Sequence, residues 1–154
     1  MHHQLLVHIV WTTRDREASI THERAAYLWE RLPIIARQER GRILELGVVT
    51  THVHVLVRLH PTTQLPRMLQ RMKGGTAYGI NGGASTDPNR LRWAKGYSVI
   101  SVSPRAIPRV TAYVREQHLR HPEQAIPGWN NPHVALATPA ESRLQPADRT
   151  GNPL

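Results

Sequence analysis

The segment THVHVLVRL at positions 51–59 places a valine at every second position from Val53 to Val57. Successive side chains of a strand point to opposite faces, whereas helical positions repeat every 3.6 residues. Three valines at this spacing therefore predict a β-strand with one apolar face directed at a core. His52 and His54 fall on the other face, where their imidazoles would stand side by side.

This histidine pair has two interpretations. Two imidazoles on a rigid strand could bind one metal ion without any help from loop geometry. They could also be a solvent-exposed pair that happens to alternate with core valines. Taken alone, the pair does not distinguish a metal site from an exposed surface.

Four strands and three helices are predicted along the chain from β-branched runs and from apolar residues at helical spacing. Pro33 should kink or divide the first helix, because a proline removes one backbone hydrogen bond. Gly74 and Gly75 should stop the second helix, for which Thr63 is the expected cap. The predicted strands are 4–13, 42–50, 52–59 and 97–102, and the predicted helices are 21–40, 65–73 and 107–120.

The order of these elements is β-α-β-β-α-β followed by a helix, which is the split βαβ order of ferredoxin-like folds. We therefore expect an α+β domain at residues 1–121, with one antiparallel sheet covered on one face. Residues 122–154 contain six of the 12 prolines and little apolar periodicity. They are predicted to form a Pro-rich tail that is extended and partly disordered.

The charge of the chain favours polyanions as partners. Lys and Arg number 20 against 11 Asp and Glu, for a formal charge of +9, and 18 of the 20 are Arg. The positive excess lies entirely within residues 1–121. A planar guanidinium suits phosphate, so nucleic acid is the favoured partner, although a solvated surface rich in Arg would give the same composition.

Several classes of protein are excluded by what the sequence lacks. With no cysteine, the chain can form no disulfide, thiolate zinc site or cysteine nucleophile. The first residues lack the basic and apolar pattern of a signal peptide, and no apolar run is long enough to cross a membrane. We expect a soluble cytoplasmic protein.

A second pattern, Tyr-x-x-x-Gln, lies in the last predicted helix. Tyr113 and Gln117 are four residues apart and therefore share one face of that helix. On its own this pair says little, because a tyrosine on an amphipathic helix is more often found at the edge of a core than in catalysis.

Taken together, a His-x-His strand followed downstream by Tyr-x-x-x-Gln resembles the single-tyrosine HUH transposases of small hairpin-bounded insertion sequences and their repeat-associated relatives. The resemblance runs through most of residues 4–121, with several motifs in the same order. These are HIVWTTRDR at 8–16, THVHVLVRL at 51–59, LQRMKGG at 69–75, RWAKGYSVISVS at 92–103 and AYVREQHLRH at 112–121.

The resemblance implies roles for four residues. His52 and His54 would be ligands of a divalent metal, Mg²⁺ or Mn²⁺, and Gln117 would be the third ligand through its amide oxygen. Tyr113 would be the nucleophile that links to a DNA 5′ phosphate and leaves a free 3′ hydroxyl. Members of the family act as dimers in which the tyrosine helix of one subunit can complete the metal site of the other, so a homodimer is expected.

One position departs from the family pattern. The family usually has an acidic residue directly before the first histidine, and this chain has Thr51 there. An acid could orient the imidazole from behind, a task that Thr51 is expected to perform only weakly.

These residue types suit phosphodiester chemistry. A divalent ion on a non-bridging oxygen polarises phosphorus and neutralises developing charge. A phosphotyrosine stores the cleaved bond for later rejoining, which simple hydrolysis would not need. We therefore expect site-specific cleavage and rejoining of single-stranded DNA at transposon ends, beside an imperfect hairpin.

Several further residues are weaker candidates. Trp93 and Tyr97 could stack unpaired bases, although Trp93 beside a strand start could equally serve packing. His8 could approach the site but is expected simply to sit in the sheet. His118 and His121 could be alternative ligands but are expected to line a helix end. Two basic runs could contact phosphates of a DNA hairpin or could be solvated surface, namely Arg58, Arg67, Arg71 and Lys73, and Arg90, Arg92 and Lys95.

Two alternative functions stay open. A domesticated relative would process repeated hairpins in its own genome without moving itself. A non-catalytic nucleic-acid-binding module on the same fold would bind DNA without metal and would form no covalent adduct.

Overall fold

The structure, a computed structural model, describes residues 5–132. Its four strands form one antiparallel sheet in the order β2-β3-β1-β4, so the expected α+β class is confirmed. The strands are β1 (Leu5–Thr12), β2 (Arg42–Val48), β3 (His52–Leu59) and β4 (Ser98–Ser101). The helices are α1 (His22–Gln38), α2 (Leu65–Gln70), α3 (Thr76–Ile80), α4 (Ile107–Arg115) and α5 (Gln117–Arg120).

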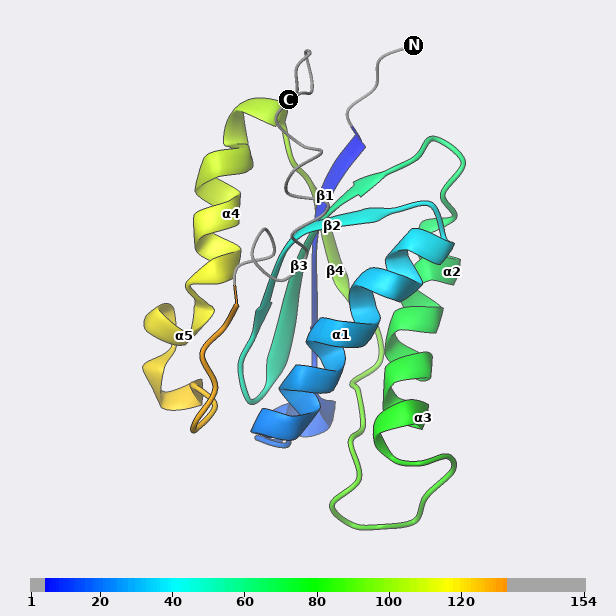
Figure 1. The fold of residues 1–154 in the computed structure, drawn as a ribbon, viewed down its shortest axis with the longest axis vertical. Helices are drawn as coiled ribbons and strands as arrows, with labels where there is room; N and C mark the ends of the chain where they lie inside the picture. Colours follow the sequence, from blue (N-terminus) through cyan, green and yellow to red (C-terminus); the bar gives the residue numbers. More distant parts are fainter. Residues whose placement is uncertain (1–4, 133–154) are drawn as a thin grey trace.

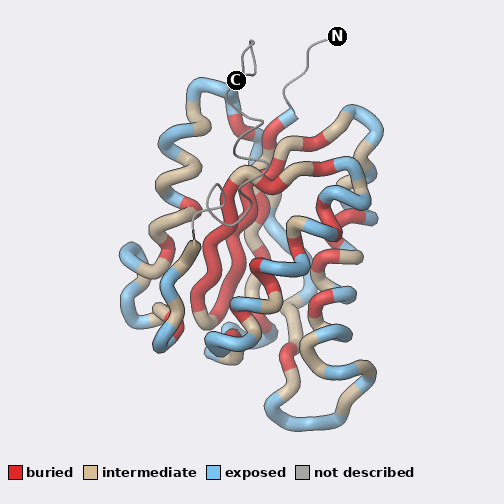
Figure 2. The backbone as a smooth tube through the Cα atoms, in the orientation of Figure 1, coloured by how far each residue is buried: buried red, intermediate tan, exposed pale blue. Residues whose placement is uncertain are grey.

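The strand β3 lies inside the sheet, between β1 and β2, and is covered on both faces. Val53, Val55 and Val57 are fully buried, as their alternation predicts, and belong to the main core with side chains of α1 and α2. Figure 1 shows α1, α2 and α3 on one side of the sheet. In Figure 2 the central strands are the most continuously buried part of the chain. The valine face of β3 therefore anchors the fold.

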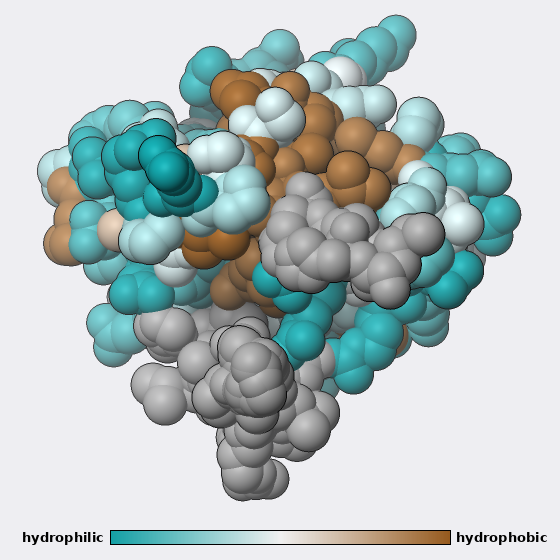
Figure 3. Space-filling model, turned by 90° about the horizontal axis from the view of Figure 1, so that it is seen from above, coloured by the Kyte–Doolittle hydropathy of each residue, from teal (hydrophilic) through white to brown (hydrophobic). Residues whose placement is uncertain are grey.

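The second face of the sheet is covered by α4, and the expectation of a sheet covered on one face is wrong. Leu6, Leu56, Val102 and Val114 form a separate buried cluster between α4 and the strands. Figure 1 shows α4 and α5 on the side of the sheet away from α1. Seen from above, hydrophobic side chains gather in the middle of the surface with hydrophilic ones around them (Figure 3). The apolar interior thus reaches the surface at this end of the molecule.

The first helix continues through Pro33 and is not divided there. α1 runs unbroken from His22 to Gln38, and the Thr21 hydroxyl accepts a hydrogen bond from the Arg24 backbone N–H at its start. Burial of Leu32 and Ile35 on either side of the proline offsets the lost backbone hydrogen bond. No helix within residues 5–132 is long and apolar enough to cross a membrane.

The second helix is not stopped by its glycines. Residues 71–75 form a π-helical turn that joins α2 to α3, and Gly75 has helical dihedral angles, φ −64° and ψ −41°. A glycine ends a helix when it adopts a left-handed conformation, which Gly75 does not. Thr63 is also not the cap, because its hydroxyl accepts from the His60 backbone N–H instead.

The last predicted helix is interrupted. Glu116, with φ −98° and ψ 22°, separates α4 from α5, so residues 107–120 form two helices rather than one. This break changes the direction of the chain just before Gln117, the residue paired with Tyr113 in the sequence motif.

The predicted tail begins with residues that pack on the domain. Ile126 is buried in the main core, and Trp129 packs against it. The Thr50 backbone N–H donates to the carbonyl of Gln124 at 2.9 Å. Residues 133–154 lie outside the described residues, and the division into a domain at 1–121 and a tail at 122–154 stays a prediction.

Two positions of α1 should differ sharply in their effect on stability. Leu32 is fully buried, so Leu32→Ala should lower the free energy of unfolding by about 2–5 kcal/mol through lost apolar contact and a cavity. Ile34 is 41% exposed, so Ile34→Ala should cost less than about 1 kcal/mol. Urea denaturation measures both changes. Equal losses would mean that α1 does not pack as described.

Candidate active site

His52 and His54 lie side by side on the face of β3 that α4 covers. Their ring centroids are 5.0 Å apart. The side chains are only 7% and 6% exposed, so the interpretation as a solvent-exposed pair is wrong. Burial of two polar rings is costly unless their nitrogens find partners, and the contacts around each ring are therefore informative.

Both imidazoles have a neighbour at Nδ1. Thr51 Oγ1 lies 2.9 Å from His52 Nδ1, and His8 Nε2 lies 2.9 Å from His54 Nδ1. A hydrogen bond at one ring nitrogen fixes the ring and leaves the other, Nε2, for a ligand. Thr51 is itself buried, so it orients His52 although it carries no charge.

Gln117 brings an amide oxygen to the first of these rings. Gln117 Oε1 lies 3.4 Å from His52 Nε2, and the side chain is 1% exposed. The amide nitrogen donates to the Tyr113 carbonyl at 2.8 Å, which turns the oxygen towards the histidine. When the proton of His52 is on Nδ1, Nε2 and Oε1 direct lone pairs at the same space.

Burial disfavours the charged form of the histidines. Desolvation lowers the pKa of His8 and His52 below the ordinary value, although the hydrogen bond with Gln117 partly opposes this for His52. The pKa of His54 is lowered to about 3, first by burial and then by repulsion from the neighbouring histidines. The rings are therefore neutral at physiological pH, which is the form of imidazole that binds a metal.

Tyr113 reaches the same histidines from α4. Its ring centroid lies 5.9 Å from that of His8 and 5.7 Å from that of His54, both in edge-to-face orientation. The guanidinium carbon of Arg120 is 4.8 Å from the Tyr113 ring centroid, within cation–π range. Tyr113 is 36% exposed, so a large substrate in solvent can reach it.

The donor set fits a divalent ion only if Gln117 takes part. Within residues 5–132, no three His, Cys, Asp or Glu side chains are grouped closely enough to hold a metal ion. His52, His54 and the Gln117 oxygen would supply two neutral nitrogens and one neutral oxygen. Imidazole is a softer donor than the oxygens that Mg²⁺ prefers, so this set suits Mn²⁺ better.

Two histidines lie closer to the site than the sequence led us to expect. His8 contacts both His54 and Tyr113, and is not merely a residue of the sheet. The His121 ring is 5.6 Å from that of His52. His8 pairs with Leu56 in the antiparallel register, and that pairing, which places His8 on the histidine face, is the signal that was missed. For His118, no ring contact with these residues is found in the described part of the chain.

The basic residues of the first run lie mostly across the sheet from the histidines. Arg67, Arg71 and Lys73 come from α2 and the π-helical turn, whose apolar residues pack in the main core. Glu39 pairs with Arg71 at 2.8 Å and with Arg67 at 3.3 Å. Lys73 Nζ donates to two backbone carbonyls of residues 94–96. These three cations already interact with protein groups in the fold, so a DNA phosphate would have to compete with those groups for them.

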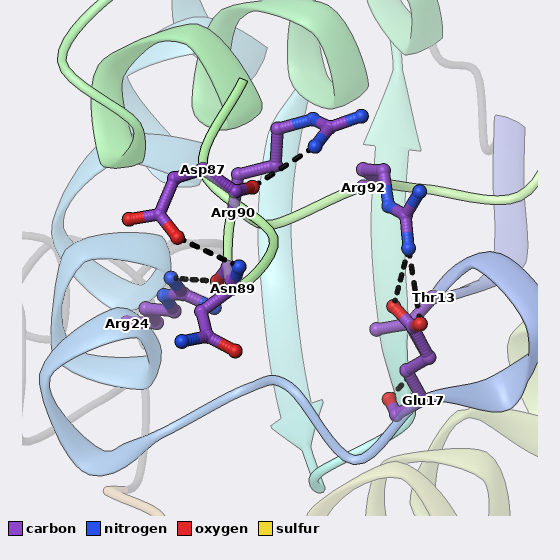
Figure 4. Close-up of polar contacts among 7 residues, drawn as sticks. All are labelled: Thr13, Glu17, Arg24, Asp87, Asn89, Arg90 and Arg92. Atoms are coloured by element: carbon purple, nitrogen blue, oxygen red, sulfur yellow. Dashed lines mark hydrogen bonds and ion pairs between the residues drawn. The ribbon is translucent and has the colours of Figure 1, made fainter. Parts of the chain in front are cut away.

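The second basic run is also tied into the fold, as Figure 4 shows. Arg92 Nη2 donates to both carboxylate oxygens of Glu17, at 3.0 and 3.2 Å. Arg24, on α1, donates through Nη2 to the Asn89 carbonyl at 2.7 Å. This contact holds the loop that contains Asn89 against α1. Lys95 is exposed.

The remaining candidates for DNA contact differ in their surroundings. Arg58 is half-buried on β3, two positions beyond Leu56 on the histidine face. Trp93 is partly buried and packs against the main core, edge-to-face on Trp11 at 5.9 Å, so its ring is not a free stacking platform. Tyr97 is 46% exposed and keeps its ring available.

The chain is similar to known transposases in sequence and in fold. The chain is 25% identical over 120 residues to the ISDra2 transposase TnpA of Deinococcus radiodurans, covering 75% of this chain and 86% of that protein. The crystal structure of a protein from Deinococcus radiodurans R1, described as a transposase, aligns with a TM-score of 0.59 and 24% identity, over 77% of this chain and 94% of that one.

A second solved structure, a REP-associated tyrosine transposase bound to a REP hairpin, aligns with a TM-score of 0.62 and 11% identity. It covers 79% of this chain and 72% of that one, and at this identity the likeness concerns the fold alone. A family model described as "Transposase IS200 like" matches residues 1–117, a stretch that includes His52, His54, Tyr113 and Gln117. The protein therefore belongs to the family of IS200-like transposases.

Proposed function

We propose that the protein cleaves and rejoins single-stranded DNA at transposon ends through a covalent link between Tyr113 and a DNA 5′ phosphate. The observation that carries this proposal is the contact between the helices α4 and α5 and the histidine face of the sheet. α4 and α5 bring Tyr113 and Gln117 to His8, His52 and His54. A nucleophile beside a set of neutral metal donors is the combination that phosphodiester cleavage requires.

In the proposed reaction, the Tyr113 oxygen attacks phosphorus. The bond between phosphorus and the tyrosine oxygen forms, and the bond between phosphorus and the DNA 3′ oxygen breaks. The tyrosine hydroxyl gives up its proton and the 3′ oxygen gains one. Attack by that or another 3′ hydroxyl reverses the process and rejoins DNA, so no bond energy is lost to water.

The residues around Tyr113 have distinct roles in this proposal. His52, His54 and Gln117 would hold a divalent ion, which when bound supplies charge neutralisation at the phosphate oxygens. Thr51 and His8 keep the two imidazoles oriented through Nδ1. Arg120, stacked over the Tyr113 ring, offers a guanidinium to the phosphate.

The proposed substrate is single-stranded DNA with a hairpin. The +9 charge supports a polyanionic partner, and the REP-associated relative of the same fold was solved with a DNA hairpin. The element order and the strand order β2-β3-β1-β4 support the ferredoxin-like assignment of the fold. A homodimer follows from the resemblance alone and stays a prediction.

A second function is favoured by the same likeness. A domesticated protein that processes repeated hairpins would use the same fold as the REP-associated transposase. Both functions require the Tyr113 adduct, whereas a non-catalytic DNA-binding module requires none. Adduct formation therefore separates the two enzymatic functions from the binding module, and the DNA that flanks the gene separates the first two.

Tyr113→Phe should abolish the covalent adduct and leave DNA binding within about twofold. The change removes one hydroxyl and keeps the ring that packs on His8 and His54. The measurement is a denaturing gel with single-stranded DNA from the gene's own flanks and Mn²⁺. Tyr78→Phe is the control, since Tyr78 is 67% exposed on α3. An adduct that persists in Tyr113→Phe and maps to another residue would contradict the assignment.

His52→Ala should weaken Mn²⁺ binding at least about tenfold, because it removes one of three donors. Titration calorimetry without DNA measures this independently of cleavage. His60→Ala is the matched control, because His60 lies just beyond β3 and contacts Thr62 rather than the site. Unchanged Mn²⁺ affinity in His52→Ala would remove His52 from the ligand set.

The affinity for a DNA hairpin should fall at least about tenfold between ~50 and ~200 mM salt, because arginines replace counterions condensed on DNA. Fluorescence anisotropy across a salt series gives the slope. Replacing the exposed Lys95 by Gln should reduce that slope by about one if Lys95 contacts a phosphate. Binding that is indifferent to salt would argue against the basic surface as the DNA site.

A further inference from the structure

A β-bulge in β2 places Glu45 and Gly47 on the face of the sheet that α4 covers. The register between β2 and β3 shifts between Ile43 and Glu45, which is a β-bulge. Beyond the bulge, Glu45 pairs with Leu56 and Gly47 pairs with His54. Residues that pair directly share a face, so Glu45 and Gly47 lie on the histidine side of the sheet.

At Gly47 the backbone of α4 lies directly against the sheet. A Cβ atom at this position would lie 1.9 Å from the Val114 carbonyl oxygen, a distance that no packing tolerates. Val114 is fully buried in the second apolar cluster, so the helix backbone cannot easily move away from β2. Only glycine allows α4 to lie at this depth beside His54.

Glu45 forms an ion pair with Arg115, the residue that follows Val114 in α4. Its carboxylate is fully buried, and Oε2 lies 2.9 Å from Nε of Arg115, whose side chain is 37% exposed. The backbone N–H of Leu46 donates to the other carboxylate oxygen at 3.3 Å. A buried carboxylate is costly to desolvate, and an apolar residue would pack more cheaply. What the ion pair adds is a directional contact that fixes where Arg115 sits.

We propose that Glu45 and Gly47 are positioning residues that dock α4 on the histidine face of the sheet, and so set Tyr113 and Gln117 at His52 and His54. Three residues at the end of α4 and the start of α5 are held: Val114 against Gly47, Arg115 by Glu45, and Gln117 at His52. Tyr113 directly precedes this anchored stretch. This inference rests on the proposed function for its catalytic part only.

The central test compares two glycine substitutions. Gly47→Ala should push α4 outwards and slow formation of the Tyr113 adduct by about a hundredfold, because small misplacements of a reacting group have effects of this size. The affinity for hairpin DNA should stay within about twofold. Gly74→Ala is the matched control, since a Cβ there meets nothing within 4 Å. Glu45→Gln, which keeps the shape and removes the charge, should slow the adduct in the same direction.

Hydrogen exchange gives a readout that does not need activity. Amides of α4 should exchange at least about tenfold faster in Gly47→Ala and Glu45→Gln, while those of α1 should not change, which also shows that the variants fold. If the wild-type chain forms no adduct, the proposed function fails, and exchange in α4 alone then decides the docking. An adduct rate in both variants equal to that of wild type, or unchanged exchange in α4, would overturn the inference.

Discussion

The site depends on β3 being covered on both faces. An inner strand with packed layers on both faces of its sheet is buried on both sides. One face carries apolar residues. Polar residues can stand on the other face only if their hydrogen bonds are satisfied. Here the valine face joins the main core, while His52 and His54 meet α4. The packing of the main core thus holds the strand backbone that carries the two imidazoles.

The layer of α4 is what converts two strand histidines into a site. Without α4, His52 and His54 would be two histidines in contact with water on one face of a strand. With it, the rings lose water and their neutral form is favoured, while Thr51 beside β3 and His8 on β1 hold the Nδ1 atoms. The helix that removes water also carries the tyrosine. Burial and the nucleophile therefore come from one packing event.

Much of this could be predicted from sequence, because alternation and chain order are local properties. The strands, the orientation of Val53 and His54, and the order of elements needed only periodicity. What failed depended on tertiary contacts. Gly75 is helical because the residues around it pack in the core, and Pro33 is tolerated for the same reason. The register that brings His8 to the site is set by pairing between distant strands, which no single segment contains.

The absence of an acid before the first histidine has a physical consequence. Thr51 orients His52 as a neutral partner, and His8 does the same for His54, so every donor and every orienting group at the site is neutral. A carboxylate would raise the basicity of the imidazole and hold a cation more tightly. With neutral groups alone, a bound ion would keep its full charge, and the guanidinium of Arg120, which pairs with Glu116 at 3.7 Å, lies beside Tyr113. On the proposed function, the site therefore binds the ion less tightly than a site with a carboxylate would, and it attracts the DNA phosphate more strongly.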